Sequence, residues 1–326
     1  MNPTFNLDLY KKFNYDLINL NDDQLNLHFN EIGQYQLRIY YPISLFKKDK
    51  VYIFSTKFGY YISCVLRYLL FKNFIFSDII YEIDHTNENL HIIPFCQKVN
   101  QFPQKYIIYQ LEQKDISKWI NKKYELAILH SLKTLDYSHS NINKFPEIIQ
   151  KKMIYYPIPI IPYHYLNYKA HINRIPHNNI LFYGSMNEIR REKLNYLKRK
   201  LYPKHSIKIV TNKYGIDLFN EILNSKIVLN IHFYKDAILE TYRINEVLSC
   251  GKIVISEKPN MIDIENYDLY KDKITFIDNI NDMALSIINI LENNYEKKEN
   301  ISFFDISKFN EIISEIYHKY IINKYI

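Results

Sequence analysis

The chain has 326 residues, 47% of them hydrophobic, with 42 basic against 35 acidic side chains and a net charge of +7. This length suits two domains, and so mild a positive charge permits an anionic ligand without the dense basic block expected for nucleic-acid binding. Three widely spaced cysteines without a CxxC pair argue against a disulfide framework or zinc, and neither a signal peptide nor a membrane-spanning run is visible, so we expect a cytoplasmic protein with no metal and no cofactor.

The first half of the chain alternates, from residue 51 onward, between apolar runs typical of strands and segments with helical periodicity. No structure is predicted for the polar, asparagine-rich residues 1–48. The predicted strands cover residues 51–55, 105–111, 126–131 and 153–157. The predicted helices cover residues 58–72, a segment from the second strand through Trp119, and residues 137–150.

A proline-dense stretch, residues 155–165, disfavours both helix and sheet and therefore predicts a hinge. Beyond this stretch the alternation is clearer. The predicted strands cover residues 179–183, 207–211, 226–232, 252–257 and 273–278. The predicted helices cover residues 184–201, 215–225, 241–250 and 281–294, and the last residues have the pattern of an amphipathic helix.

Strands with continuous β-branched runs that alternate with helices indicate parallel sheets covered on both faces. The expected fold class is therefore α/β, with two doubly wound, Rossmann-like lobes. Residues 1–165 form the first lobe, residues 166–305 the second, and residues 306–326 a helix that packs back on the first lobe. Ligands of such sheets bind beyond the carboxyl ends of the strands, so the residues that follow the strands of the second lobe are the first candidates for a site.

One candidate segment is LFYGSMNEIRREK, in which Gly184 follows a predicted strand and precedes a predicted helix. Ser185 and Glu188 fit a capping box with Ser185 as the N-cap, after which Arg190 and Lys193 belong to a solvated basic face. The same geometry suits a diphosphate, because a glycine turn exposes backbone N–H groups at the positive end of a helix. The sequence leaves both interpretations open.

A second candidate segment is ETYRINEVLSCG. Arg243 and Glu246 lie three residues apart on the predicted helix, which is the spacing of an ordinary surface ion pair. This helix begins just past the strand that ends at His232, however, so its first turn faces the predicted cleft. Glu240 at this end offers two acceptor oxygens for vicinal ribose hydroxyls, and Arg243 offers a fork of donors to phosphate or to a glutamate.

Polar residues after strands of the first lobe are candidates for the facing wall of the cleft. They are Glu112 and the group Tyr137, Ser138 and Asn141. The alternatives are a surface glutamate and a helix cap at Asp136 or Ser138.

The loop 82–89 places His85 beside Asp84, a combination that suits a general base but also occurs in ordinary polar loops. The sequence contains no Walker motif, no HExxH and no GxSxG, and its five glycines do not supply a dinucleotide-binding fingerprint.

Taken together, LFYGSMNEIRREKL and the segment 225–257 resemble the second lobe of GT-B glycosyltransferases, and look most like the glycosyl transferase group 1-like proteins of bacteria and large DNA viruses. KYIIYQLEQ, LDYSHSNI and YYPIP of the first lobe also resemble that group, and the likeness spans roughly residues 100–295. The resemblance implies the GT-B architecture and a metal-independent transfer of a sugar from a nucleotide-sugar donor to a hydroxyl acceptor such as a glycan, polysaccharide or protein.

The resemblance also implies roles for particular residues. Gly184 and Ser185, with Arg190 or Lys193, correspond to the turn and helix that contact the donor diphosphate, and Glu246 in EVLSCG corresponds to the glutamate that binds the nucleotide ribose.

The chain departs from the retaining enzymes of the family, because Ile238 stands where they place a second glutamate. Glu240, six residues before Glu246, and His232 are therefore the catalytic candidates near the donor sugar, with Arg243 as a further phosphate ligand. Whether the reaction inverts or retains configuration stays open. The alternative function is a noncatalytic nucleotide-sugar or phosphate-binding protein of two α/β lobes.

Overall fold

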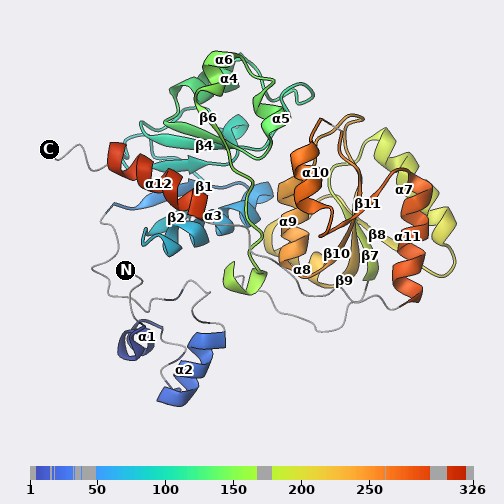
Figure 1. Cartoon of the computed structure of the whole chain (residues 1–326), viewed down its shortest axis with the longest axis horizontal. Helices are drawn as coiled ribbons and strands as arrows, with labels where there is room; N and C mark the ends of the chain where they lie inside the picture. The colour runs from blue at the N-terminus through green and yellow to red at the C-terminus, as the bar shows by residue number, and fades with distance from the viewer. Residues whose placement is uncertain are drawn as a thin grey trace.

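A computed structural model of the chain describes residues 5–14, 17, 19–31, 33, 38, 49–166, 178–260, 262–293 and 307–320. Two short helices near the N-terminus, α1 (Leu7–Phe13) and α2 (Asp22–Glu31), pack through a small apolar cluster of their own around Tyr10, Leu17 and Leu25. The remainder forms two α/β lobes, each built on a parallel sheet (Figure 1).

The first lobe contains a six-stranded parallel sheet with the order β2-β1-β3-β4-β5-β6. Its strands are β1 (Val51–Phe54), β2 (Ser77–Ile80), β3 (His91–Ile93), β4 (Tyr106–Gln110), β5 (Lys133–Asp136) and β6 (Met153–Tyr155). Helices α3 (Tyr60–Lys72) and α12 (Ser307–Tyr320) share one hydrophobic cluster with this sheet. A second hydrophobic cluster of this sheet includes residues of α4 (Lys122–His130), α5 (His139–Ile142) and α6 (Glu147–Gln150). Single 3-10 turns occur at η4 (Lys57–Gly59), η5 (Cys96–Lys98) and η6 (Tyr163–Leu166).

The second lobe contains a five-stranded parallel sheet with the order β11-β10-β9-β7-β8. Its strands are β7 (Asn178–Tyr183), β8 (Ile207–Val210), β9 (Ser225–Asn230), β10 (Ile253–Glu257) and β11 (Thr275–Ile277). Helices α8 (Gly215–Leu223), α9 (Thr241–Ser249) and α10 (Ile264–Tyr270) cover one face, and α7 (Glu188–Leu201) and α11 (Ile280–Glu292) cover the other. The predicted fold class, two doubly wound lobes, is confirmed.

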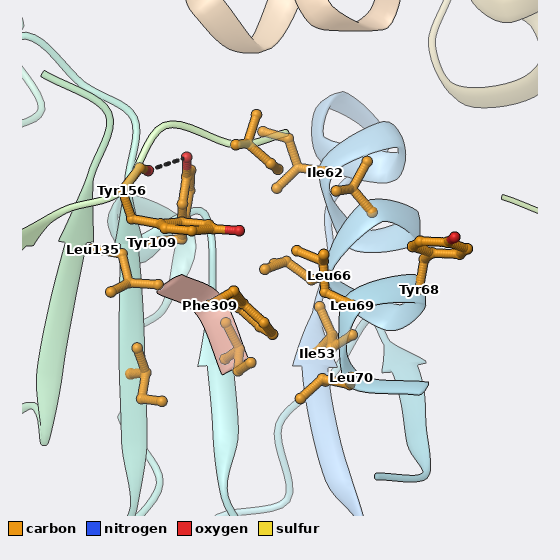
Figure 2. Packing of buried hydrophobic residues seen from close by; sticks show 14 of the residues in the cluster. Ile53, Ile62, Leu66, Tyr68, Leu69, Leu70, Tyr109, Leu135, Tyr156 and Phe309 are labelled. Atoms are coloured by element: carbon orange, nitrogen blue, oxygen red, sulfur yellow. Dashed lines mark hydrogen bonds between the residues drawn. The ribbon is translucent and has the colours of Figure 1, made fainter. Parts of the chain in front are cut away.

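The predicted terminal helix also packs where it was expected. Phe309 of α12 is fully buried in the core of the first lobe, and Ile312, Ile313 and Ile316 follow it at helical spacing. Figure 2 shows the Phe309 ring between the side chains of α3, such as Leu66, and those of the neighbouring strands. The apolar stripe of α12 therefore completes a core that is far from it in sequence.

Several predictions for the first lobe are wrong. Residues 126–131, predicted as a strand, belong mostly to α4, whose N-cap Asn121 accepts a hydrogen bond from the Tyr124 N–H at 3.1 Å. The strand follows instead at β5. No helix leads from β4 through Trp119, and the single helix predicted over residues 137–150 is two short helices separated at Pro146. The strands β2 and β3, and helix α10 of the second lobe, were not predicted.

Hydrogen bonds join the two lobes directly. Ser138 after β5 donates to Asp263 before α10 at 2.8 Å, and Asn266 of α10 donates to the Tyr137 carbonyl at 3.2 Å. The Gln113 side chain exchanges hydrogen bonds with both backbone groups of Ile238. The residues after β4 therefore face the loop that precedes α9, and the residues after β5 face the start of α10. Among the helices of the described residues, none has the length and apolarity needed to cross a membrane.

Replacing Phe309 with alanine tests the packing of α12. The ring is fully buried, so Phe309→Ala should lower the free energy of unfolding by about 3–5 kcal/mol in chemical denaturation. Leu285 of α11 is 59% exposed, and Leu285→Ala should change that free energy by less than about 0.5 kcal/mol. Equal effects of the two variants would contradict the burial of α12.

Candidate functional site

The candidate site lies where the strand order of the second sheet reverses. The chain runs from β7 outward to β8 and then returns to the other side of β7 as β9, so β7 and β9 flank the switch point. The carboxyl ends of strands at such a point leave a crevice in which α/β sheets bind their ligands. Gly184 follows β7 here, and Ile231 and His232 follow β9.

Gly184 is required by both its backbone and its surroundings. Its φ of +130° lies in a region that side chains disfavour, and a Cβ atom added to it would lie 2.2 Å from Nη2 of Arg243. The absence of a side chain therefore allows the Arg243 guanidinium to approach the turn after β7.

The helix after this turn begins later than the capping box predicted. Asn187 is the N-cap of α7, and its side chain accepts a hydrogen bond from the Arg190 N–H at 2.9 Å. The same side chain donates to the Phe233 carbonyl at 2.7 Å. The assignment of Ser185 as N-cap is wrong. Its carbonyl oxygen accepts a hydrogen bond from Nη1 of Arg190 at 2.8 Å instead.

The Arg190 side chain is only 2% exposed, so of the two interpretations left open by the sequence the one that places it on a solvated face is wrong. Its Nε donates to the Ile231 carbonyl at 2.8 Å, while Nη1 donates to Ser185 on the opposite side of the switch point. Its guanidinium carbon also lies 5.2–5.5 Å from the ring centroids of Phe182 and Phe233. Arg190 thus joins the turn after β7 to the turn after β9 while keeping its charge.

Arg190, Arg243 and Glu240 meet at this point, and we call them the arginine–glutamate cluster. Oε2 of Glu240 lies 3.2 Å from Nη1 of Arg243 and 3.8 Å from Nη2 of Arg190. These three atoms are buried, and none makes a hydrogen bond of ordinary geometry within the described part of the chain. Within the cluster, two cations against one carboxylate leave an excess positive charge, with donors that an anionic ligand can accept from. The carboxylates of Glu257, itself paired with Lys193, and Glu246 act more weakly on Arg190 and Arg243.

The pKa values follow from this arrangement. Burial alone would raise the pKa of Glu240, but the charges of Arg243 and Arg190 lower it below its ordinary value, so Glu240 stays ionised. Burial and repulsion from Arg243 lower the pKa of Arg190 to about 10, and Arg190 is still a cation at neutral pH. Burial likewise disfavours the charged form of Arg243, but the carboxylate of Glu240 raises its pKa overall.

Lys193 and His232 are positioned through Glu257 at the end of β10. Lys193 forms an ion pair with Oε1 of Glu257, whose Oε2 accepts the His232 backbone N–H at 2.8 Å. The Nε2 of His232 lies 3.2 Å from the carbonyl oxygens of Glu257 and Lys258. Because burial lowers its pKa, the imidazole is neutral and donates through Nε2. Its buried Nδ1 has no hydrogen-bond partner among the described residues.

Glu246 lies at the boundary between the lobes. The hydroxyl of Tyr183 donates to its Oε2 at 3.3 Å, and the carboxylate acts electrostatically on Tyr61 and Cys64 of α3 in the first lobe. Burial raises the pKa of Glu246 to about 7, against the opposing effects of Tyr183 and Arg243. The surface ion pair between Arg243 and Glu246 is not formed, since Arg243 pairs with Glu240.

The first-lobe candidates separate into two groups. Glu112 is half-buried, and burial followed by the charge of Glu240 raises its pKa against a hydrogen bond from Ser117. Tyr137, Ser138 and Asn141 are buried, so they do not line an open wall.

For Ser138 and Asp84, the structural role fits better than the functional one. Ser138 is the N-cap of α5 and accepts the Asn141 N–H at 3.3 Å, as a helix cap should. Asp84 accepts hydrogen bonds from the N–H and hydroxyl of Thr86, which is the pattern of an ordinary polar turn.

A cavity of about 810 Å³ opens between the lobes at the edge of the second sheet beyond β7. Thr56, Lys57, Tyr60 and Tyr81 line it from the first lobe. Asn212, Tyr214, Gly215, Ile216 and Asp217 line it from the second lobe. Since Asn212 follows β8 and the Gly184 N–H donates to Val210 at the end of that strand, the cavity lies next to the turn after β7.

The described residues contain no group of three or more His, Cys, Asp or Glu side chains placed to hold a metal ion.

Comparison with known proteins found no matching family model and no matching curated protein. Among solved structures, the chain is similar to sucrose-phosphate synthase from Thermosynechococcus elongatus, with 8% identity, a TM-score of 0.49, and coverage of 83% of this chain and 100% of that one. It is also similar to an α1,3-fucosyltransferase, with 8% identity, a TM-score of 0.46, and coverage of 89% and 97%. Because both TM-scores are below 0.5, the fold assignment rests on the strand order of this chain and not on these similarities.

Removing the charge of Glu240 tests the cluster. Glu240→Gln leaves two buried guanidiniums without their counter-charge, and should lower the free energy of unfolding by about 3–5 kcal/mol at pH 7. Because the folded-state pKa of Glu240 is lowered, the contribution of its charge is present above its unfolded pKa of about 4.3 and disappears as the pH falls further.

Glu221→Gln is the matched control. Glu221 also bridges two cations, but Lys208 and Lys213 are 40% and 50% exposed, so its loss should cost about 1 kcal/mol or less. Denaturation curves at pH 7 compare the two variants, and an equal loss would show that the cluster is an ordinary surface network.

Proposed function

We propose that the chain is a glycosyltransferase that moves a sugar from a nucleotide-sugar donor to a hydroxyl group of an acceptor. The observation that supports it most directly is the arginine–glutamate cluster beside Gly184, at the switch point of one α/β lobe and facing a second lobe. This arrangement suits a diphosphate ligand that must be held in a cleft while a bond to it breaks.

In this proposal the diphosphate lies against Gly184 and Ser185, with Arg243 as its cationic partner. Arg190 holds the turns after β7 and β9 in place and adds a second positive charge near the diphosphate. Lys193 does not contact the diphosphate; it pairs with Glu257, which holds the backbone of His232 after β9. As the C1–O bond to diphosphate breaks, negative charge develops on the departing phosphate. Donors fixed beforehand stabilise this charge without reorganising, and the step calls for no metal ion.

The nucleoside extends from the diphosphate toward β8. Glu246 accepts hydrogen bonds from the ribose hydroxyls, and the cavity beside Asn212 and Tyr214 takes the base. This orientation places the sugar at the opposite side, at the start of α9. Glu240 and the Nδ1 of His232 then act as acceptors for sugar hydroxyls, and the acceptor substrate approaches from the first lobe.

A binding and turnover screen of UDP-, GDP- and dTDP-sugars tests this function. Gly184→Ala should abolish the affinity of the preferred nucleotide in calorimetry, because the new methyl group displaces Arg243. Gly251→Ala is the matched control, since Gly251 also has a positive φ, of +68°, but nothing lies within 4 Å of an added Cβ. Gly251→Ala should lose about 1–2 kcal/mol of stability from its positive φ alone. Gly184→Ala should lose more, because its methyl group also displaces the buried Arg243, and only Gly184→Ala should lose binding.

Failure of every nucleotide to bind the wild type would reject the function. Binding without release of sugar to water or to any of a panel of glycans would instead favour a noncatalytic binding protein.

The pKa of Glu246 predicts how nucleotide affinity depends on pH. Because this pKa is about 7, the carboxylate that accepts from ribose is partly protonated at neutral pH. Affinity for the nucleoside diphosphate should therefore rise between pH 6 and pH 8, and Glu246→Gln should bind several-fold more weakly at pH 8 than the wild type and lack this rise. Glu265→Gln, which removes an exposed carboxylate of the same lobe, should bind as the wild type does. An unchanged affinity of Glu246→Gln at pH 8 would refute the ribose role.

A further inference from the structure

Glu112 lies two residues beyond β4 and next to Gln113, which hydrogen-bonds Ile238 of the second lobe. Its backbone is held from several directions. The Gln110 side chain accepts the Glu112 N–H and donates to the Glu112 carbonyl. Asn141 donates to the same carbonyl at 3.0 Å. Gln110 and Asn141 both donate in turn to the buried carboxyl group of Asp136, at 3.1 and 2.8 Å. The position of Glu112 is thus fixed from within its own lobe.

The carboxyl group of Glu112 receives one hydrogen bond on each oxygen. Gln97 donates to Oε1 at 2.8 Å and Ser117 donates to Oε2 at 2.6 Å. A carboxylate oxygen has two lone pairs, so each retains capacity for a further donor. Within the described ranges no lysine or arginine forms an ion pair with Glu112, whereas Glu240 pairs with Arg243 and Glu257 pairs with Lys193.

The groups around Glu112 make it a stronger proton acceptor than Glu240. Glu240 of the second lobe repels its charge, Lys98 attracts that charge less strongly, and the hydroxyls of Tyr124 and Tyr234 also interact with it electrostatically. The pKa of Glu112 is raised by burial first and by Glu240 second, while the pKa of Glu240 is lowered by its arginines. A general base must be ionised in order to accept a proton and must then bind that proton well, and a carboxylate with a raised pKa suits this task better than one with a lowered pKa.

We propose that Glu112 is the catalytic base that removes the proton from the acceptor hydroxyl. This inference rests on the proposed glycosyltransferase function. The acceptor oxygen forms a bond to C1 of the donor sugar while its proton passes to the Glu112 carboxylate. The C1–O bond to the diphosphate breaks, and its electron pair leaves with the phosphate, next to Arg243. A base on the first lobe, across from the phosphate site of the second lobe, suits attack on the face of C1 opposite the leaving phosphate, so we expect the reaction to invert the anomeric configuration.

The experiment compares Glu112→Gln with the wild type and with Glu125→Gln, a first-lobe control that loses an equal charge at a lysine pair. The probes are UDP-, GDP- and dTDP-sugars, and turnover is followed as release of nucleoside diphosphate with water or a glycan panel as acceptor. Glu112→Gln should bind the nucleoside diphosphate within about twofold of the wild type and lose turnover by about 10²–10⁴-fold. The control should retain both.

The pH profile supplies a readout that a structural role would not move. Wild-type turnover should fall as the pH drops through the pKa of Glu112, since only the ionised form accepts a proton. Ser117→Ala removes the hydrogen bond that favours the ionised form, so it should shift this acid limb to higher pH without abolishing turnover. This variant keeps the test open even if Glu112→Gln folds poorly.

Three results would overturn the proposal: turnover by Glu112→Gln within tenfold of the wild type, a product with retained anomeric configuration by NMR, or an acid limb that Ser117→Ala leaves in place. A wild type that neither binds nor turns over any of the probes would reject the glycosyltransferase function, and this inference with it. Nucleotide binding and turnover by the wild type, with turnover also in Glu112→Gln, would reject the base alone.

Discussion

The site depends on holding two guanidinium groups next to each other inside the protein. Arg190 and Arg243 repel, and burial adds to the cost of both charges, so neither would stay without the carboxylate of Glu240 between them. The backbone oxygens of Ser185 and Ile231 satisfy Arg190 without neutralising it, and Gly184 makes room for Arg243. The result is positive charge fixed in advance at the carboxyl ends of β7 and β9, where the proposed diphosphate would lie.

The placement of Glu240 depends on both lobes. The two residues before it are held by partners outside their own loop: the Ile238 N–H donates to Gln113 of the first lobe at 3.1 Å, and the Leu239 N–H donates to Asp263 at 2.9 Å. Asp263 also accepts from Ser138 of the first lobe. Contacts across the lobe boundary therefore orient the start of α9, and the same boundary carries Glu112 on its other side. The geometry of the cluster and the spacing of the lobes are coupled.

The sequence predicted the second lobe well because its strands are continuous apolar runs with helices of clear periodicity between them. It failed at residues 126–131, where a short apolar run fits either a strand or the end of a helix, and the Asn121 cap that decides the matter lies upstream. For the site, the sequence indicated Gly184, Glu240 and Arg243 through their places after strands. It could not show that Arg190 is buried, because its partner Ile231 lies 41 residues away. Asn187 is a strong N-cap residue type and offered a signal that the Ser185 capping box obscured.

A crystal structure of the complex with a nucleoside diphosphate tests the central claim most directly. The account predicts phosphate oxygens within hydrogen-bond distance of Arg243 and the backbone after β7, with the ribose hydroxyls on Glu246. A nucleotide bound elsewhere, with Arg243 still facing only Glu240, would contradict it.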